Sequence, residues 1–142
     1  MKRSKCILYV EDNESDLMLM QRIFVKEIDN CKLKHFYDAN SCLKWLNEII
    51  ITDELPSMIL LDLKLVGMNG LDLLQHIRTF KKLKHIPVIM MSSSVEPKDI
   101  RKAYENRASS YVEKPKNYVN LKDTVKSIVH YWTDLNKYNY DY

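Results

Sequence analysis

Five short apolar runs alternate along this chain with five stretches in which apolar residues recur at helical spacing. The runs occupy residues 6–10, 33–37, 58–61, 88–91 and 110–112. Each run fits a buried or half-buried strand, and the intervening stretches fit amphipathic helices. Strands that alternate with helices indicate a parallel sheet covered on both faces and joined by right-handed crossovers. The sequence therefore predicts a doubly wound α/β domain with five strands and five helices.

Residues that favour helix starts support this assignment. Ser41 is expected to cap the second helix, Asn69 precedes the third, and Pro97 suits the first turn of the fourth. The fifth helix has the clearest apolar stripe. This stripe consists of Leu121, Val125, Ile128, Val129 and Trp132.

Length and composition narrow the class of protein. A chain of 142 residues fits one domain, with an expected core at about 5–133 and a tail, 134–142, that is expected either to extend the last helix and pack on a partner or to fray. A net charge of +3 does not indicate a nucleic-acid partner. The apolar runs fall far short of the ~20 residues of a membrane span, so no membrane partner is expected. The chain has two glycines, Gly67 and Gly70, which are too few for a Walker or dinucleotide-binding loop.

The cysteines point to a reducing compartment. Cys6, Cys31 and Cys42 are odd in number and lack metal-binding spacing. A disulfide framework and a zinc site are both disfavoured, and a cytoplasmic location is expected.

Charged and hydroxyl side chains follow four of the predicted strands. Glu11 and Asp12 end the first strand, Asp62 ends the third, Ser92 ends the fourth and Lys114 ends the fifth. In doubly wound sheets, ligands bind beyond the carboxyl ends of the strands. We therefore expect these groups to converge into one site.

Electrostatics predict what this site binds. Two carboxylates ~4 Å apart repel by about 4 kcal/mol at an effective dielectric of about 20, and one lysine offsets only part of the repulsion among three. A hard divalent cation with oxygen ligands, Mg²⁺, relieves the remainder. With such a cation, Asp62 could attack a phosphoryl group while Lys114 and Ser92 neutralise its oxygens.

Five sequence segments carry a family resemblance. They are ILYVEDN at 7–13, MILLDL at 58–63, GMNG at 67–70, PVIMMSS at 87–93 and YVEKP at 111–115. In order and spacing this set resembles the receiver domain of response regulators and covers about residues 5–130. The resemblance implies a flavodoxin-like sheet with strand order 2-1-3-4-5.

The resemblance also implies a role for each site residue. Asp62 would be the phosphoacceptor, Asp12 and Asp62 would bind Mg²⁺ directly, Glu11 would bind it through water, and Lys64 would add its backbone carbonyl.

Two more groups would contact the phosphoryl oxygens, and two would form a switch. Ser92 would hydrogen-bond one oxygen, and Lys114 would pair with another. Tyr111 matches the switch aromatic, which would turn inward as the Ser92 hydroxyl moves toward the phosphate.

The implied function is that of a stand-alone response regulator without a DNA-binding output domain, and not an enzyme. Its phosphoryl donor would be a sensor histidine kinase or a histidine phosphotransfer protein. Output to an unknown protein target, or formation of a homodimer, would use the fourth helix, fifth strand and fifth helix. The Tyr131-Trp132 pair late in the last helix resembles small regulators paired with phytochrome-type kinases.

Some positions depart from the family pattern. Glu11 replaces the more frequent aspartate and Ser92 the more frequent threonine, and both keep the needed oxygen. Arg107 stands where glycine is frequent, so Asn106 is expected to supply the turn before the fifth strand.

Three other functions were weighed against this one. A haloacid dehalogenase-type phosphohydrolase also uses an aspartyl nucleophile, but it has a second aspartate two positions on, where this chain has Lys64. A degenerate receiver used only for docking would have lost the acids or the lysine. A flavodoxin-like electron carrier would present hydroxyls and amides after its first strand, where Glu11 and Asp12 stand.

Overall fold

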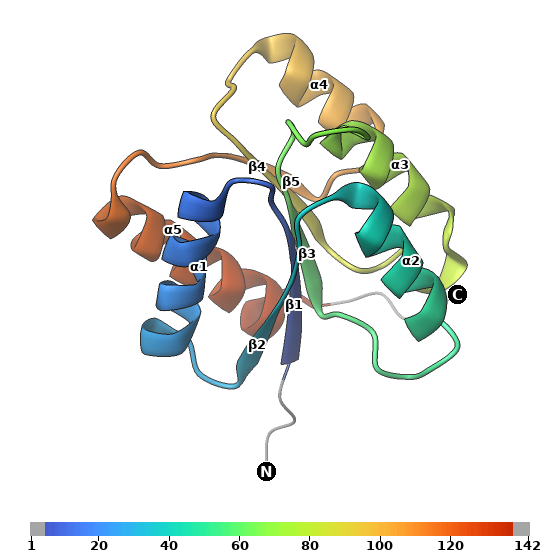
Figure 1. Ribbon diagram of the computed structural model, residues 1–142, viewed down its shortest axis with the longest axis horizontal. Helices are drawn as coiled ribbons and strands as arrows, with labels where there is room; N and C mark the ends of the chain where they lie inside the picture. The colour runs from blue at the N-terminus through green and yellow to red at the C-terminus, as the bar shows by residue number, and fades with distance from the viewer. Residues whose placement is uncertain (1–4, 138–142) are drawn as a thin grey trace.

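A parallel five-stranded sheet forms the centre of the computed structural model, which describes residues 5–137 (Figure 1). The strands run in the spatial order β2-β1-β3-β4-β5. They are β1 (Lys5–Val10), β2 (Cys31–Phe36), β3 (Met58–Leu61), β4 (Val88–Ser92) and β5 (Ser110–Glu113). The predicted fold class and strand order are confirmed.

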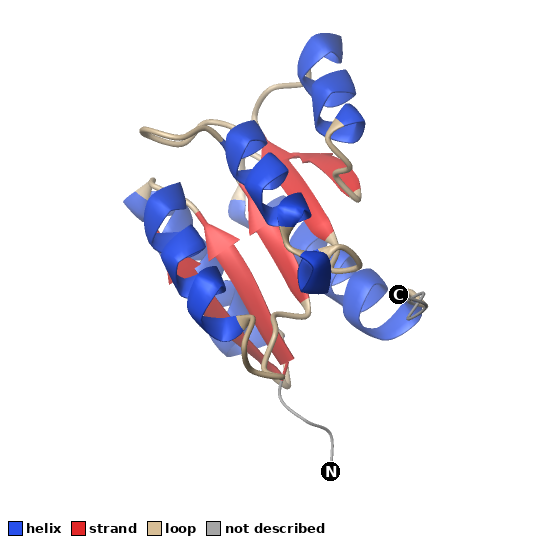
Figure 2. Ribbon diagram, turned by 90° about the vertical axis from the view of Figure 1, so that its right-hand side faces the viewer, coloured by secondary structure: helices blue, strands red, loops and turns tan. Residues whose placement is uncertain are grey.

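Helices cover both faces of this sheet. They are α1 (Glu14–Glu27), α2 (Ala39–Ile49), α3 (Gly70–Thr79), α4 (Pro97–Glu105) and α5 (Tyr118–His130), with the short helices η1 (Lys81–Leu83) and η2 (Tyr131–Leu135). Figure 1 shows α1 and α5 on one face and α2 and α3 on the other. Figure 2 shows the same layers from the side, with the strands between the helices. None of the helices in residues 5–137 is long and apolar enough to cross a membrane.

The alternation of side chains along the strands builds two cores. On β1, Ile7 and Tyr9 pack with α1 and α5, whereas Leu8 and Val10 pack with α2 and α3. All four are buried. Because both faces of the central strands are covered, their apolar runs are continuous, and polar residues appear only where the strands end.

Side-chain caps fix where the helices begin. Asn13, Asn69 and Asn117 each accept a hydrogen bond from a backbone N–H in the first turn of α1, α3 and α5. The predicted cap at Ser41 is wrong: α2 begins at Ala39, and Asp38 is its cap. The Asp38 carboxylate accepts both the backbone N–H and the hydroxyl of Ser41.

The turn before β5 also differs from expectation. Arg107 itself adopts the left-handed conformation, with a φ of 67°. Asn106, at a φ of −94°, remains outside that region. The backbone nitrogen of Arg107 donates to the Tyr104 carbonyl, and its guanidinium donates to the Arg78 carbonyl. These bonds hold a conformation that a side chain rarely adopts.

The end of the described chain is tied to its beginning. The Lys5 ammonium donates to the Thr133 carbonyl at 2.7 Å and to the Asp134 carboxylate at 2.9 Å. Residues 138–142 of the 134–142 tail lie outside the described residues.

Candidate functional site

One ammonium group lies among three carboxylates beyond the carboxyl ends of the strands. Lys114 follows β5, and its Nζ lies 2.9 Å from Glu11 Oε1, 2.9 Å from Asp62 Oδ2 and 3.0 Å from Asp16 Oδ2. Glu11 comes directly after β1 and Asp62 directly after β3. The structure therefore brings together three of the groups expected at this edge, Glu11, Asp62 and Lys114.

Glu11 is the most deeply buried of these carboxylates, with no exposed surface. Burial raises its pKa to about 8, against the lowering effect of the Lys114 hydrogen bond, while the hydrogen bond and charge of Asp62 raise it further. The Tyr9 hydroxyl donates to Glu11 Oε1 at 3.4 Å, and the Asp12 backbone N–H donates to Oε2 at 3.2 Å. Burial and the negative charge of Glu11 raise the pKa of Tyr9 above its usual range, so Tyr9 remains a donor.

Lys114 stays charged despite its burial. Desolvation alone would lower its pKa, but hydrogen bonds to Glu11, Asp62 and Asp16 raise it above its usual range. Three carboxylates against one ammonium leave the cluster with excess negative charge when all are ionised. A site of this kind attracts a further cation.

The β3–α3 loop holds the other carboxylate oxygens. The backbone N–H of Lys64 donates to Asp62 Oδ1 at 3.1 Å, and that of Val66 donates to Asp12 Oδ2 at 3.1 Å. Asp12 is thus next to Glu11 but is bound to the loop rather than to Lys114. The Lys64 backbone was expected to supply a carbonyl oxygen to the site; in this structure its N–H contacts Asp62.

Gly70 allows this loop to close against the site. Its backbone nitrogen donates to the Leu63 carbonyl at 2.8 Å. A Cβ at this position would overlap the Asp62 carbonyl oxygen and would lie 2.9 Å from Leu63 Cα. Only glycine permits the start of α3 to approach β3 this closely.

Ser92 and Lys114 are neighbours through the sheet. The Lys114 backbone N–H donates to the Ser92 carbonyl at 2.7 Å. The Ser92 hydroxyl is buried and accepts the Ser94 backbone N–H at 3.1 Å. Among the hydrogen bonds of residues 5–137, its side chain has none to Asp62, so in this conformation the Ser92 hydroxyl takes no part in the hydrogen bonds around Lys114.

Tyr111 is joined to the same loop. Its hydroxyl donates to the Ser94 carbonyl at 2.8 Å, and the Ser94 hydroxyl donates to Asp99 of α4 at 2.6 Å. A chain of hydrogen bonds therefore runs from Ser92 through Ser94 to both β5 and α4. Sequence reasoning singled out Ser92 and Tyr111 but missed Ser94.

The donor set suits a hard cation by its chemistry. Glu11, Asp12 and Asp62 offer only oxygen ligands. In this conformation, no three acidic, histidine or cysteine side chains of residues 5–137 form a ready metal-ligand set. Lys114 occupies the position between Glu11 and Asp62, and a divalent cation would have to take over part of its contacts.

Asp16 is a second residue that sequence reasoning missed. It lies in the first turn of α1, which follows the Glu11-Asp12 pair directly. The sequence feature that could have indicated it is an acid four residues after Asp12, in the first turn of α1. Its direction depends on how α1 docks on the sheet, which the sequence pattern does not specify.

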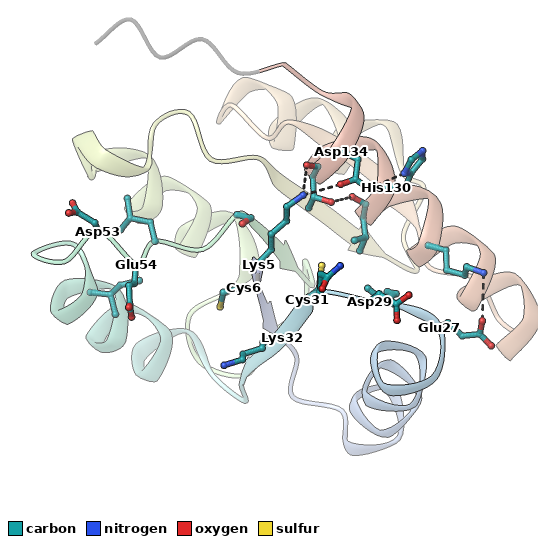
Figure 3. A pocket seen from close by; sticks show the side chains of 18 of the residues that line it. Lys5, Cys6, Glu27, Asp29, Cys31, Lys32, Asp53, Glu54, His130 and Asp134 are labelled. Carbon is teal, nitrogen blue, oxygen red and sulfur yellow. Dashed lines mark hydrogen bonds and ion pairs between the residues drawn. The ribbon is translucent and has the colours of Figure 1, made fainter. Parts of the chain in front are cut away.

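A large cavity lies elsewhere, at the ends of the sheet where β1 and β2 begin (Figure 3). It has a volume of about 1240 Å³ and is lined by Lys5, Cys31, Asp134 and others, but by none of the predicted site residues. Four of the charged groups on its wall are paired with one another, Lys5 with Asp134 and Lys126 with Glu27. The convergence of unlike charges around Lys114 is the better guide to chemistry than cavity size.

Comparison with known proteins agrees with this geometry. Residues 7–126 match the family described as "Response regulator receiver domain". The "Probable methanogenesis regulatory protein FilR2" of Methanothrix harundinacea is 34% identical over 135 residues, covering 92% of this chain and 85% of its own. "Response regulator Rcp1" of Synechocystis is 29% identical over 132 residues, covering 92% and 90%.

Solved structures give the same result. The crystal structure of the phosphorylated cyanobacterial phytochrome response regulator RcpA has a TM-score of 0.86 and 29% identity, covering 94% of this chain and 97% of that one. The Mn²⁺-bound form of Rcp1 has a TM-score of 0.82 and 28% identity, covering 95% and 99%. The family match covers most of this chain, and the strand order and the acids at the strand ends agree with it. This chain therefore belongs to the response regulator receiver domain family of two-component signalling.

Proposed function

We propose that Asp62 accepts a phosphoryl group from a phosphohistidine on a sensor histidine kinase or a histidine phosphotransfer protein. The observation that carries this proposal is the 2.9 Å contact between Asp62 Oδ2 and the Lys114 ammonium at the carboxyl edge of the sheet. Asp62 retains 13% side-chain exposure, so a donor can reach it. Its other oxygen is fixed by the Lys64 N–H, which directs Oδ2 toward the lysine.

The transfer needs positioning more than covalent assistance. An Asp62 carboxylate oxygen forms a bond to phosphorus while the phosphorus–nitrogen bond of the phosphohistidine breaks, and the imidazole nitrogen keeps the electron pair. Lys114 neutralises charge on the phosphoryl oxygens, and Ser92 supplies a hydroxyl from the adjacent strand. The product is an aspartyl phosphate.

Magnesium is the proposed metal. Asp12 and Asp62 would bind it directly, Glu11 would bind it through water, and Lys64 would add its carbonyl. Bound there, it would neutralise oxygens of the transferring group. The raised pKa of Glu11 supports this assignment because a buried carboxylate gains most from a new cation.

The proposed switch uses the hydrogen bonds from Ser92 to Tyr111. A phosphoryl oxygen on Asp62 would draw the Ser92 hydroxyl, whose oxygen accepts the Ser94 N–H. Because the Ser94 carbonyl accepts the Tyr111 hydroxyl, a shift of this loop would reach β5 and α4 together.

The output is proposed to be a protein contact. The receiver domain would act through α4, β5 and α5, by binding a target protein or a second copy. Tyr104 on α4 is 49% exposed and Val119 on α5 is 58% exposed, so this face offers apolar contact area. The similarity to RcpA and Rcp1 makes a phytochrome-type kinase the first donor to try, and the exchange would take place in the cytoplasm.

The acceptor is tested with a small-molecule phosphodonor and Mg²⁺, read by intact mass. The native protein should gain one phosphoryl group, and Asp62→Asn should gain none. Asp72→Asn, an exposed acid of α3, is the matched control and should label as the native protein does. Label retained by Asp62→Asn would show that another residue is the acceptor. Steady release of inorganic phosphate from a phosphate ester would instead favour a phosphohydrolase.

A further inference from the structure

The carboxylate of Asp16 reaches Lys114 from α1 rather than from a strand end. Its Oδ2 lies 3.0 Å from the Lys114 ammonium, whereas Asp12 is bound by the β3–α3 loop. We propose that Asp16 is a positioning residue, which holds Lys114 while Asp62 is unmodified and competes with a phosphoryl group on Asp62 for the same ammonium. This inference rests on the proposed function and assigns a role to a residue outside the implied ligand set.

The start of α1 fixes the position of Asp16. The Asn13 side chain caps the helix by accepting the Asp16 backbone N–H at 2.9 Å. This cap places Asp16 in the first turn, directly after the segment that carries Glu11 and Asp12. The contact with Lys114 spans 98 residues of sequence, so it joins α1 to the loop between β5 and α5.

The ammonium has no spare donor. A lysine has three N–H groups, and Lys114 directs them to Glu11, Asp16 and Asp62. A phosphoryl oxygen on Asp62 would therefore have to take a donor from one of the present partners.

Asp16 is the partner that gives up its contact at least cost. Its side chain is 32% exposed, against 1% for Glu11 and 13% for Asp62. A carboxylate that can be hydrated loses less when its ion pair breaks than one that stays buried without a partner. The contact with Asp16 is therefore the one of the three that breaks most easily.

The packing leaves room for this exchange. A cavity of about 50 Å³ adjoins the ion pair and is lined by both Asp16 and Lys114, with Tyr9, Met20 and Leu121 behind them. Two effects follow when the Asp16 charge is removed. One N–H donor of Lys114 becomes free for a phosphoryl oxygen. The negative charge of Asp16, which would repel the phosphoryl group, is also removed. Both effects favour the phosphorylated form.

The test uses beryllofluoride, a phosphoryl mimic, with saturating Mg²⁺ and a binding titration followed by NMR. Asp16→Asn should bind beryllofluoride about threefold or more tightly than the native protein, as expected for loss of a partly buried competing ion pair. Glu14→Gln is the matched control, because Glu14 is also an acid in the first turn of α1 but accepts from Tyr37 instead of contacting Lys114. It should stay within about 1.5-fold of native, since a helix-dipole effect alone is small.

A second measurement reports on the contact without any phosphoryl mimic. Denaturant unfolding of Asp16→Asn, Lys114→Met and the double variant, without metal, should give a coupling of about threefold or more in the unfolding equilibrium constant. The pair Glu14→Gln and Lys114→Met should be additive.

The outcomes separate this inference from the proposed function. If the native protein binds beryllofluoride and Asp16→Asn binds it equally or more weakly, the inference is overturned and the function stands. Additive unfolding effects of Asp16→Asn and Lys114→Met would overturn it as well. If the native protein neither binds the mimic nor takes up phosphate, the proposed function fails, and the competition fails with it.

Discussion

The Tyr104 hydroxyl oxygen accepts the backbone N–H of Tyr111 at 3.1 Å, which ties α4 to the strand at the edge of the sheet. The Tyr111 hydroxyl in turn donates to the Ser94 carbonyl. Two tyrosines thus link α4, β5 and the β4–α4 loop through one backbone group and one side chain.

Tyr104→Phe should free the amide of Tyr111. The substitution removes the acceptor and keeps the ring, so the free energy of unfolding should change by no more than about 1 kcal/mol. Amide hydrogen exchange at Tyr111 should become several-fold faster. Tyr131→Phe, at a similarly exposed tyrosine, is the control and should leave that rate unchanged. An unaltered rate in Tyr104→Phe would show that the hydroxyl does not protect β5.

Lys114→Met should destabilise the protein at neutral pH in the absence of metal. It leaves Glu11, Asp16 and Asp62 facing one another without their common cation, which for partly buried groups costs about 3–5 kcal/mol. Urea unfolding measures the loss. Divalent cations should restore more stability in this variant than in the native protein, because they would replace the missing positive charge.

The control for this experiment is Lys116→Met. Lys116 is exposed and close in sequence, so its replacement should shift the urea midpoint little. Equal, small effects of both variants would contradict the central place given to Lys114.

Glu11→Gln should alter how stability depends on pH. Burial raises the pKa of Glu11 from 4.5 to about 8, so the folded protein binds a proton that the unfolded chain has lost between these values. This contribution to the stability of the native protein is complete below about pH 4.5 and falls away as the pH rises toward 8. Glu11→Gln lacks it.

The measurement is the free energy of unfolding of both proteins, without metal, from pH 4.5 to 8. The stability of Glu11→Gln relative to native should increase through this window, by about 4 kcal/mol. Glu113→Gln, at an exposed position, should show no such trend. A stability of Glu11→Gln relative to native that stays constant or falls as the pH rises would mean that the pKa of Glu11 is not raised in the folded protein.

Arg78→Met should lower stability by about 2–4 kcal/mol. Arg78 is 9% exposed, and its guanidinium donates to the carbonyls of Arg107, Leu83 and Ile86 and to the Ser109 hydroxyl. Burial, together with the nearby charge of Arg107, lowers its pKa to about 10. These bonds join α3, η1 and the turn before β5.

The loss is measured by denaturant unfolding. Arg101→Met is the control, because the Arg101 side chain is 66% exposed and its contact with Glu105 is 3.9 Å long. Arg78→Lys should also be destabilised, since one ammonium cannot reach all of these acceptors. A loss below 1 kcal/mol for Arg78→Met would contradict the role given to its hydrogen bonds.

The sequence predicted β1, β3 and β4 closely because polar, charged or proline residues bound their apolar runs, whereas β2 lies at 31–36 instead of the expected 33–37. Met58–Leu61 agrees residue for residue, and Val88–Ser92 extends the expected 88–91 by one. The start of α2 was wrong because Asp38 and Ser41 can both cap a helix and stand three residues apart. Which of them does so depends on the exit direction of β2.

The candidate site was predicted in part for a similar reason. Strand ends gave Glu11, Asp62 and Lys114, because parallel strands bring their carboxyl ends to one edge. Asp16 lies in α1 and Ser94 in the β4–α4 loop. Their contacts depend on how this helix and this loop pack on the sheet, which the spacing of apolar residues does not specify. The left-handed backbone of Arg107 was missed because part of its support comes from Arg78, which lies on α3 and is distant in sequence.

The backbone hydrogen bond between Lys114 and Ser92 has a further consequence. The Ser92 and Lys114 side chains would contact different oxygens of a transferred phosphoryl group. They stand at neighbouring positions of the β4–β5 pairing, so sheet geometry fixes their separation. Loops around this edge can therefore diverge in length and composition while the span between hydroxyl and ammonium is preserved. Variation in these loops would change which donors and targets are recognised and would leave the distance between the Ser92 hydroxyl and the Lys114 ammonium unchanged.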